Sequence, residues 1–321
     1  MISPKKIDVL LSPTKIKNVF KKESKKLGIK PQSIREIKIK VIKEYIDWRS
    51  FSLVALYSLN KQRKIIGTAN SDGKKNYAFK INKLISRQFS KKKIKNFSAP
   101  KPYCYFKPLE LFLREYLKGE NFGKILKKKK EIKTIHIKRI AEIIVFLQKF
   151  DIAGRFIKKG VDFSAIEKNI KILKQRKVRE VKVLSEIFKK VRKKIRDYEK
   201  KNRNKVLVHG DFNPYNFFFE QDKIKIADFG SSHLGDRVSD LANLLSQLET
   251  SLDFKIPKEK RLSLENTLLD YYQKITKKFN DSEKEKLKIY RTYFDLLIVS
   301  HIIVWGNSSQ GIKILKKLKH F

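Results

Sequence analysis

Two carboxylates and an amide follow two short strand-like stretches in the middle of the chain. Asp211 comes shortly after Val206 to Val208, Asn216 five residues later, and Asp228 directly after Ile224 to Ala227. Phosphoryl transfer from a nucleotide needs little covalent help from the protein. It does need divalent metal held against the phosphates and a group that orients the attacking hydroxyl. This order of side chains predicts a phosphoryl-transfer site.

Each of these side chains suits one task at such a site. Asp211 stands on a loop after a strand and a glycine, where its carboxylate can accept a proton from a bound alcohol. Mg²⁺ prefers hard oxygen ligands and takes only one or two carboxylates from a protein. We therefore expect Asp211 to be the catalytic base, and Asn216 with Asp228 to be the magnesium ligands.

Four neighbouring polar residues are expected to have other roles. His209 should support the loop by packing and hydrogen bonding. Asp240 precedes an apolar run, so it should cap that helix or tie it to the catalytic loop. His233 and Asp236 could face the substrate, but a solvated loop is the favoured interpretation.

The motifs are similar to those of a known family. His-Gly-Asp-x4-Asn at 209–216, Asp-x-Gly at 228–230 and Gly-Asp-x3-Asp-Leu-Ala at 235–242 resemble the signature of aminoglycoside phosphotransferases, choline kinases and their relatives. The stretch from residue 99 to 122 resembles that family's last N-lobe strands and hinge. The resemblance implies ATP as donor, Mg²⁺, a small-molecule hydroxyl as acceptor, and adenine bound by main-chain groups near Glu115 and Leu117.

The elements that must position these residues form two groups. Together with the resemblance, they predict an α+β, bilobal protein-kinase-like fold, with an N-lobe at residues 1–117 and a helical C-lobe at 118–321. An N-capped helix is expected from Ser12 to Gly28. Three antiparallel strands should follow it, and one charged helix should come later in the chain. These ranges are Ile37 to Trp48, Phe51 to Leu59, Lys64 to Ala69, and Ser164 to Lys200 for the helix.

The N-terminal half departs from the kinase pattern. Kinases of this fold pair a lysine on the third strand with a glutamate on the next helix. If Tyr77 to Ile81 is that strand, Lys80 is the phosphate-binding lysine. If it is Lys64 to Ala69, Thr68 stands there and Lys80 lies on a helix, which the spacing favours. No acid occurs between Gly73 and Leu109, and a glycine-rich phosphate loop is absent.

Composition narrows the class of protein. The single cysteine, Cys104, excludes an internal disulfide and a cysteine metal cluster. The apolar window Tyr293 to Trp305 is too short and too polar to span a membrane and predicts a buried helix. The N-terminus shows no secretory cleavage site, so we expect a cytoplasmic protein.

The net charge of +44 leaves two explanations for the lysines. It favours phosphate-rich partners, including nucleotides and nucleic acid, but a biased genome composition explains it equally well.

Because twelve positions separate Asp228 from Asp240, there is no room for a peptide-holding activation loop. The alternatives are an atypical RIO-like protein kinase and a catalytically weak kinase-fold protein that binds RNA. A neutral or anionic metabolite suits the charge better than a polycationic aminoglycoside.

Overall fold

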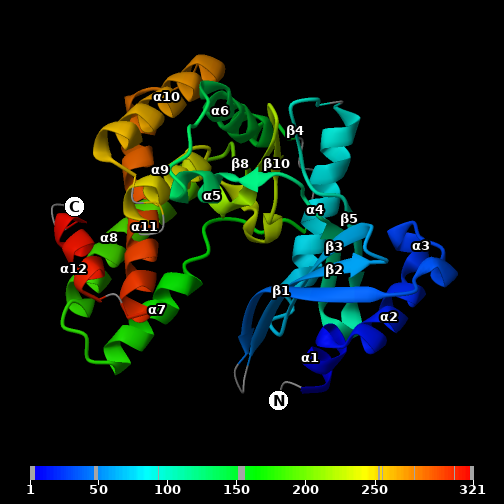
Figure 1. Ribbon diagram of the computed structural model, residues 1–321. Helices are drawn as coiled ribbons and strands as arrows, with labels where there is room; N and C mark the ends of the chain where they lie inside the picture. Colours follow the sequence, from blue (N-terminus) through cyan, green and yellow to red (C-terminus); the bar gives the residue numbers. More distant parts are fainter. Residues whose placement is uncertain are drawn as a thin grey trace. The chain divides into compact units, whose positions relative to one another are not determined.

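The computed structural model describes residues 4–46, 50–92, 94–150, 156–251, 254, 256–277, 279–306 and 308–318. By its contacts the chain divides into two compact units, coloured along the sequence in Figure 1. Unit 1 comprises Met1–Gly119 and Lys225–Gly230, and unit 2 comprises Glu120–Ile224 and Ser231–Phe321. One lobe is predicted from the sequence for all of residues 118–321, whereas the contacts group the segment around Asp228 with unit 1.

Unit 1 is built on a five-stranded sheet in the order β1-β2-β3-β6-β5, whose neighbouring strands pair antiparallel. The predicted antiparallel sheet is therefore confirmed. Side chains of β2 alternate between buried and half-buried, the period of two that a strand imposes. The end predicted for the first strand, Trp48, lies outside the described residues. The strands are β1 (Ile37–Ile46), β2 (Phe51–Leu59), β3 (Arg63–Asn70), β5 (Pro102–Phe106) and β6 (Leu111–Glu115).

The register assigns the side chains of β6 to two faces. Leu113 lies opposite Gly67, and both belong to the face that carries the main apolar cluster. Phe112 and Arg114 lie opposite Thr68 and Ile66, and they occupy the other face. The sheet thus separates an apolar core from a face that carries charge.

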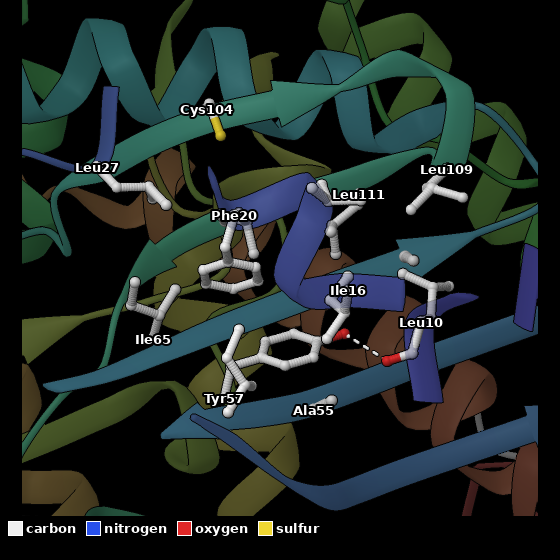
Figure 2. Close-up of a cluster of buried hydrophobic side chains, with 14 of the residues drawn as sticks. Leu10, Ile16, Phe20, Leu27, Ala55, Tyr57, Ile65, Cys104, Leu109 and Leu111 are labelled. Atoms are coloured by element: carbon white, nitrogen blue, oxygen red, sulfur yellow. Dashed lines mark hydrogen bonds between the residues drawn. The ribbon is translucent and has the colours of Figure 1, made fainter. Parts of the chain in front are cut away.

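Three short helices cover the apolar face of the sheet: α1 (Pro4–Leu11), α2 (Pro13–Lys22) and α3 (Ser24–Leu27). The Ser12 side chain accepts from the N–H of Lys15 and caps α2, as predicted. Figure 2 shows Phe20 and Tyr57 within this core, where the Tyr57 hydroxyl donates to the Leu10 carbonyl (3.1 Å). The predicted single helix is interrupted, because the backbone leaves helical geometry at Glu23 (ψ 10°).

Helix α4 (Lys74–Lys91) packs on the other face of the sheet, where Phe79 contacts Phe112 edge to face with ring centroids 5.7 Å apart. The helical interpretation of Tyr77 to Ile81 is therefore correct, and the strand alternative is wrong. Lys80 is exposed on this helix. A short strand, β4 (Phe97–Ser98), follows.

Unit 2 is mainly helical, as predicted. The expected charged helix from Ser164 to Lys200 is two helices, because Lys177 takes a left-handed conformation (φ 53°) between them. The predicted buried helix near the C-terminus is the second half of α11, which packs against α9. The helices are α5 (Phe122–Lys127), α6 (Thr134–Gln148), α7 (Ser164–Gln175), α8 (Val181–Lys201), α9 (Ser239–Thr250), α10 (Lys258–Thr276), α11 (Asp281–Val304) and α12 (Ser308–Lys317).

Short strands frame the catalytic region of unit 2. Strand β8 (Val206–Val208) pairs antiparallel with β11 (His233–Gly235), which the sequence analysis does not predict. Strand β9 (Phe217–Glu220) pairs with β7 (Glu120–Asn121) and turns into β10 (Lys223–Ile226). The β interruption expected within the helical half is therefore present.

Strand β1 is an edge strand with an unusual surface. Val41, Ile42, Tyr45 and Ile46 are exposed on it, interleaved with exposed lysines. An edge strand offers unpaired backbone groups to other chains, and charged side chains hinder such pairing.

In the part of the chain that the structure describes, no helix combines the length and hydropathy that crossing a bilayer would need.

Candidate active site

The loop after β8 carries Asp211 and depends on a glycine. Gly210 has a left-handed backbone (φ 80°), and a Cβ at this position would stand 2.2 Å from the carbonyl oxygen of Ser231. Only glycine fits both the conformation and the space. The loop that holds the predicted base is therefore pressed directly against the segment after Gly230.

Asp240 ties helix α9 to this loop. Its Oδ2 accepts from the N–H of His209 (2.7 Å) and its Oδ1 from the N–H of Gly210 (3.0 Å). Burial raises the pKa of Asp240 to about 7, against the opposing effect of these two hydrogen bonds. The carboxylate is 2% exposed, so its role is to hold the loop rather than to meet substrate.

His209 supports the same loop from inside. Its side chain is fully buried, its Nδ1 accepts from the N–H of Asp211 (3.3 Å), and its ring lies edge to face with that of Phe212. The Ser232 hydroxyl donates to the His209 carbonyl (3.1 Å). Segment 231–233 therefore braces the loop at several points.

Asn216 is brought directly to Asp211. It ends a short 3₁₀ turn, Pro214–Asn216, and its Nδ2 donates to the Asp211 carbonyl (3.0 Å) and to Asp211 Oδ2 (3.2 Å). This orientation turns Oδ1 of Asn216 away, and no hydrogen bond engages that oxygen within the described residues. The amide oxygen is therefore left for a metal ion, and an oxygen of this kind is a ligand that Mg²⁺ accepts.

Asp228 belongs to unit 1 and is exposed. It takes a left-handed conformation (φ 63°), and its Oδ1 would lie 3.3 Å from a Cβ placed on Gly230. Across the described ranges no group of three or more His, Cys, Asp or Glu side chains could hold a metal ion. The predicted ligands, Asn216 and Asp228, are one amide and one carboxylate, a set that this kind of group does not include.

Glu115 and Leu117 stand at the end of β6. The Glu115 carboxylate accepts from the N–H of Lys101 (3.0 Å) and pairs with Lys225 (3.4 Å), so its side chain is engaged within unit 1. The Leu117 side chain is buried. Within the described residues the main-chain N–H and C=O of Leu117 make no hydrogen bond. A free main-chain N–H and C=O can form hydrogen bonds with the edge of a nucleotide base.

Two residues expected in a solvated loop are buried instead. His233 is 7% and Asp236 is 1% exposed. Asp236 Oδ2 meets Lys286 and Asn202, each at 3.3 Å, and its Oδ1 accepts from the N–H of Val238 (3.2 Å). Burial lowers the pKa of His233, which favours the neutral ring. The solvated-loop interpretation is wrong, because β11 buries His233 and the next residue after that strand, Asp236, is buried by its own partners.

Sequence reasoning did not single out Arg114, which lies on the charged face of β6 near Asp228. Burial lowers the pKa of Arg114, while the charges of Asp228 and Glu115 raise it. An arginine that ends an apolar strand just before Glu-Tyr-Leu is the signal that could have drawn attention to it.

Comparisons with known proteins place the chain in a family. Residues 84–277, more than half of the chain, match the family described as "Phosphotransferase enzyme family". No curated protein matches the chain.

Solved structures share the fold at low identity. APH(2'')-IIa, in a ternary complex with streptomycin and ATP, is 15% identical, with a TM-score of 0.57 over 95% of this chain and 96% of that one. The choline kinase of Cryptosporidium parvum is 18% identical, with a TM-score of 0.56 over 95% and 92%. A macrolide 2'-phosphotransferase of Brachybacterium faecium is 12% identical, with a TM-score of 0.53 over 88% and 92%.

The structural matches confirm the protein-kinase-like α+β fold, and the range matched by the family includes the segments around Asp211 and Asp228. This chain belongs to the phosphotransferase enzyme family and is a kinase with an alcohol group as acceptor.

Proposed function

We propose that this enzyme transfers the γ-phosphoryl group of ATP, with Mg²⁺, to the hydroxyl of a neutral or anionic metabolite. The observation that carries the proposal is the hydrogen-bonded pair of Asp211 and Asn216 on a loop braced by Asp240. A loop held at three points places a base with the small positional error that catalysis tolerates.

Asp211 acts on the acceptor. Its carboxylate orients the attacking hydroxyl and accepts its proton, while the amide of Asn216 fixes the carboxylate through Oδ2. Asn216 and Asp228 would hold Mg²⁺, which when bound neutralises charge that develops on the phosphates. His209 and Asp240 keep the backbone of the loop in place.

The nucleotide is assigned to unit 1. The unengaged main chain of Leu117, next to Glu115, suits the edge of adenine. We further propose that residues 1–117 and 118–321 act as the N-lobe and C-lobe of the enzyme, with segment 225–230 serving the N-lobe.

The acceptor is inferred from charge. With a net charge of +44, the field of this protein repels a polycation and attracts an anion. The family match favours a small-molecule kinase over an atypical protein kinase. Nothing in the named relatives supports the nucleic-acid partner that the charge alone allowed.

A thermal-shift titration tests the proposal, because a ligand that binds the folded state raises its apparent stability. ATP should raise the melting temperature of the wild type when Mg²⁺ is present, and Asp228→Asn should lose the Mg²⁺-dependent part. A screen of sugars, amino alcohols and phosphorylated alcohols for ADP release then identifies the acceptor. If ATP shifts neither protein with or without Mg²⁺, the proposed donor is wrong.

A further inference from the structure

The face of the sheet that packs on α4 lacks the charged pair of kinases. Thr68 stands at the third-strand position, and no acid occurs on α4. Asn82 is 1% exposed on that helix, and its Oδ1 has no hydrogen-bond partner within the described part of unit 1. Some other group must supply positive charge if phosphates bind here.

Arg114 is on this face. It lies opposite Ile66 in the register and two residues from Phe112, which contacts Phe79 of α4. Its strand is central in the sheet, between β3 and β5, so the backbone that carries the guanidinium is rigid.

The segment with Asp228 runs beside the end of β6. Lys225 pairs with Glu115, the residue next to Arg114, with Nζ and Oε1 3.4 Å apart. Five residues on, a Cβ on Gly230 would lie 3.5 Å from the Ala78 side chain of α4. The ion pair and the close approach of Gly230 to Ala78 place the segment with Asp228 next to the end of β6 and to α4, and the Asp228 charge acts on the Arg114 guanidinium.

The guanidinium of Arg114 is not engaged in holding the fold together. No hydrogen bond or ion pair engages it within the described residues of the chain. Other half-buried arginines are committed: Arg139 pairs with Glu142 at 2.6 Å, and Arg291 with Glu249 at 2.6 Å. A half-buried arginine with donors to spare, close to a candidate metal ligand, is placed to bind an anion.

We infer that Arg114 of β6 is the cation that binds the nucleotide phosphates in this enzyme, in the role that a third-strand lysine fills in other kinases. The inference rests on the proposed function. The guanidinium offers a planar fork that matches two phosphate oxygens, and burial keeps this interaction from being screened by solvent.

Isothermal titration calorimetry with ATP and with adenosine, both with Mg²⁺, tests this role without requiring turnover. Arg114→Met should weaken ATP binding by about 10- to 100-fold, the value of a charge-assisted hydrogen bond or two. Adenosine has no phosphate, so its affinity should stay within about twofold of wild type. Arg114→Lys keeps the charge but not the planar fork, so it should restore part of the ATP affinity that Arg114→Met loses. Arg87→Met, an exposed arginine of α4, is the matched control.

Four results would overturn the inference. Equal loss of ATP and adenosine binding in Arg114→Met, without rescue in Arg114→Lys, would mean that Arg114 only supports packing. Loss of ATP binding in Lys80→Met together with normal binding in Arg114→Met would give the role to Lys80. A wild type that binds adenosine and ATP equally well would exclude any phosphate-binding cation, and a wild type that binds neither would overturn the proposed function as well.

Discussion

The catalytic loop of unit 2 and the α4-facing side of the sheet in unit 1 differ in how their polar groups are hydrogen-bonded. The backbone of the Asp211 loop is held by hydrogen bonds, since the N–H groups of His209 and Gly210 donate to Asp240 and the Asn216 amide donates to Asp211. In unit 1 the Oδ1 atoms of Asn70 and Asn82 have no partner within the described residues.

This difference corresponds to two tasks of a kinase, which are positioning the acceptor and binding the nucleotide. The group that meets the acceptor is held by hydrogen bonds to its own loop and therefore has one geometry. The groups assigned to the nucleotide depend on charges without fixed partners, such as Arg114. Substitutions in the first region should therefore damage turnover, and substitutions in the second should change nucleotide affinity or stability.

The largest effect is expected at the base itself. Asp211→Asn should lower turnover by about 10²- to 10⁴-fold, the usual contribution of a general base. ATP binding should persist, because the amide keeps the shape of the side chain. Steady-state kinetics and calorimetry separate the two quantities, with Asp222→Asn, an exposed acid in the turn before β10, as the control. Loss of binding equal to the loss of turnover would contradict the assigned role.

A buried acid of unit 2 should make stability depend on pH. Asp295 of α11 accepts from the Thr250 hydroxyl (2.7 Å), and burial raises its pKa to about 6 from 3.8. The stability associated with the protonated form is complete below about pH 4 and is lost as the pH rises through about 6.

Asp295→Asn keeps the acceptor for Thr250 and cannot ionise. The free energy of unfolding of the variant should therefore gain on the wild type by about 3 kcal/mol between pH 4 and pH 8. Urea unfolding at pH 4, 6 and 8 measures this gap, with the exposed Asp197→Asn as the reference. A gap that does not change with pH would show that Asp295 stays in one protonation state.

Substitution of two glycines can distinguish the effect of backbone strain from the effect of contact with a neighbouring segment. Gly210 and Gly73 both have left-handed backbones, but a Cβ meets Ser231 at 2.2 Å in the first and nothing within 4 Å in the second. Gly210→Ala should lower turnover by up to about 100-fold by displacing Asp211. Gly73→Ala should cost only about 1 kcal/mol of stability in thermal unfolding. Equal turnover in the two variants would mean that the loop tolerates displacement.

The smallest effect is expected from the unpaired amide of unit 1. Asn82→Leu removes a buried acceptor without a partner and should raise the free energy of unfolding by about 1 kcal/mol. Asn169→Leu in unit 2 removes a donor to the Ser300 hydroxyl (2.9 Å) and should lower it. Chemical denaturation compares them directly, and a change of the same sign in both would remove the contrast between the units.

Local patterns predicted the elements whose side chains show their own periodicity. Strand β2 matches its predicted range because its alternation is complete, and the helix around Tyr77 was favoured on spacing. The motifs also placed Asp211 and Asn216 in one loop, where the structure shows them hydrogen-bonded.

What sequence reasoning missed depends on distant contacts. The break at Lys177 uses a conformation that lysine has no intrinsic reason to adopt. Strand β11 has three residues and exists because it pairs with β8, so His233 and Asp236 looked like loop residues. Arg114 becomes a candidate site residue only because the segment with Asp228, more than a hundred residues away in the chain, lies near it.

The exposed edge of β1 has a consequence for handling the protein. Ile42, Tyr45 and Ile46 would let two chains join strand to strand, and the exposed lysines of the strand, Lys38, Lys40 and Lys43, oppose this by repulsion. Salt screens that repulsion, with a Debye length of about 10 Å at 0.1 M and about 3 Å at 1 M. The protein should therefore behave as a colloid stabilised by charge, which stays dispersed in dilute buffer and associates through this edge at high ionic strength.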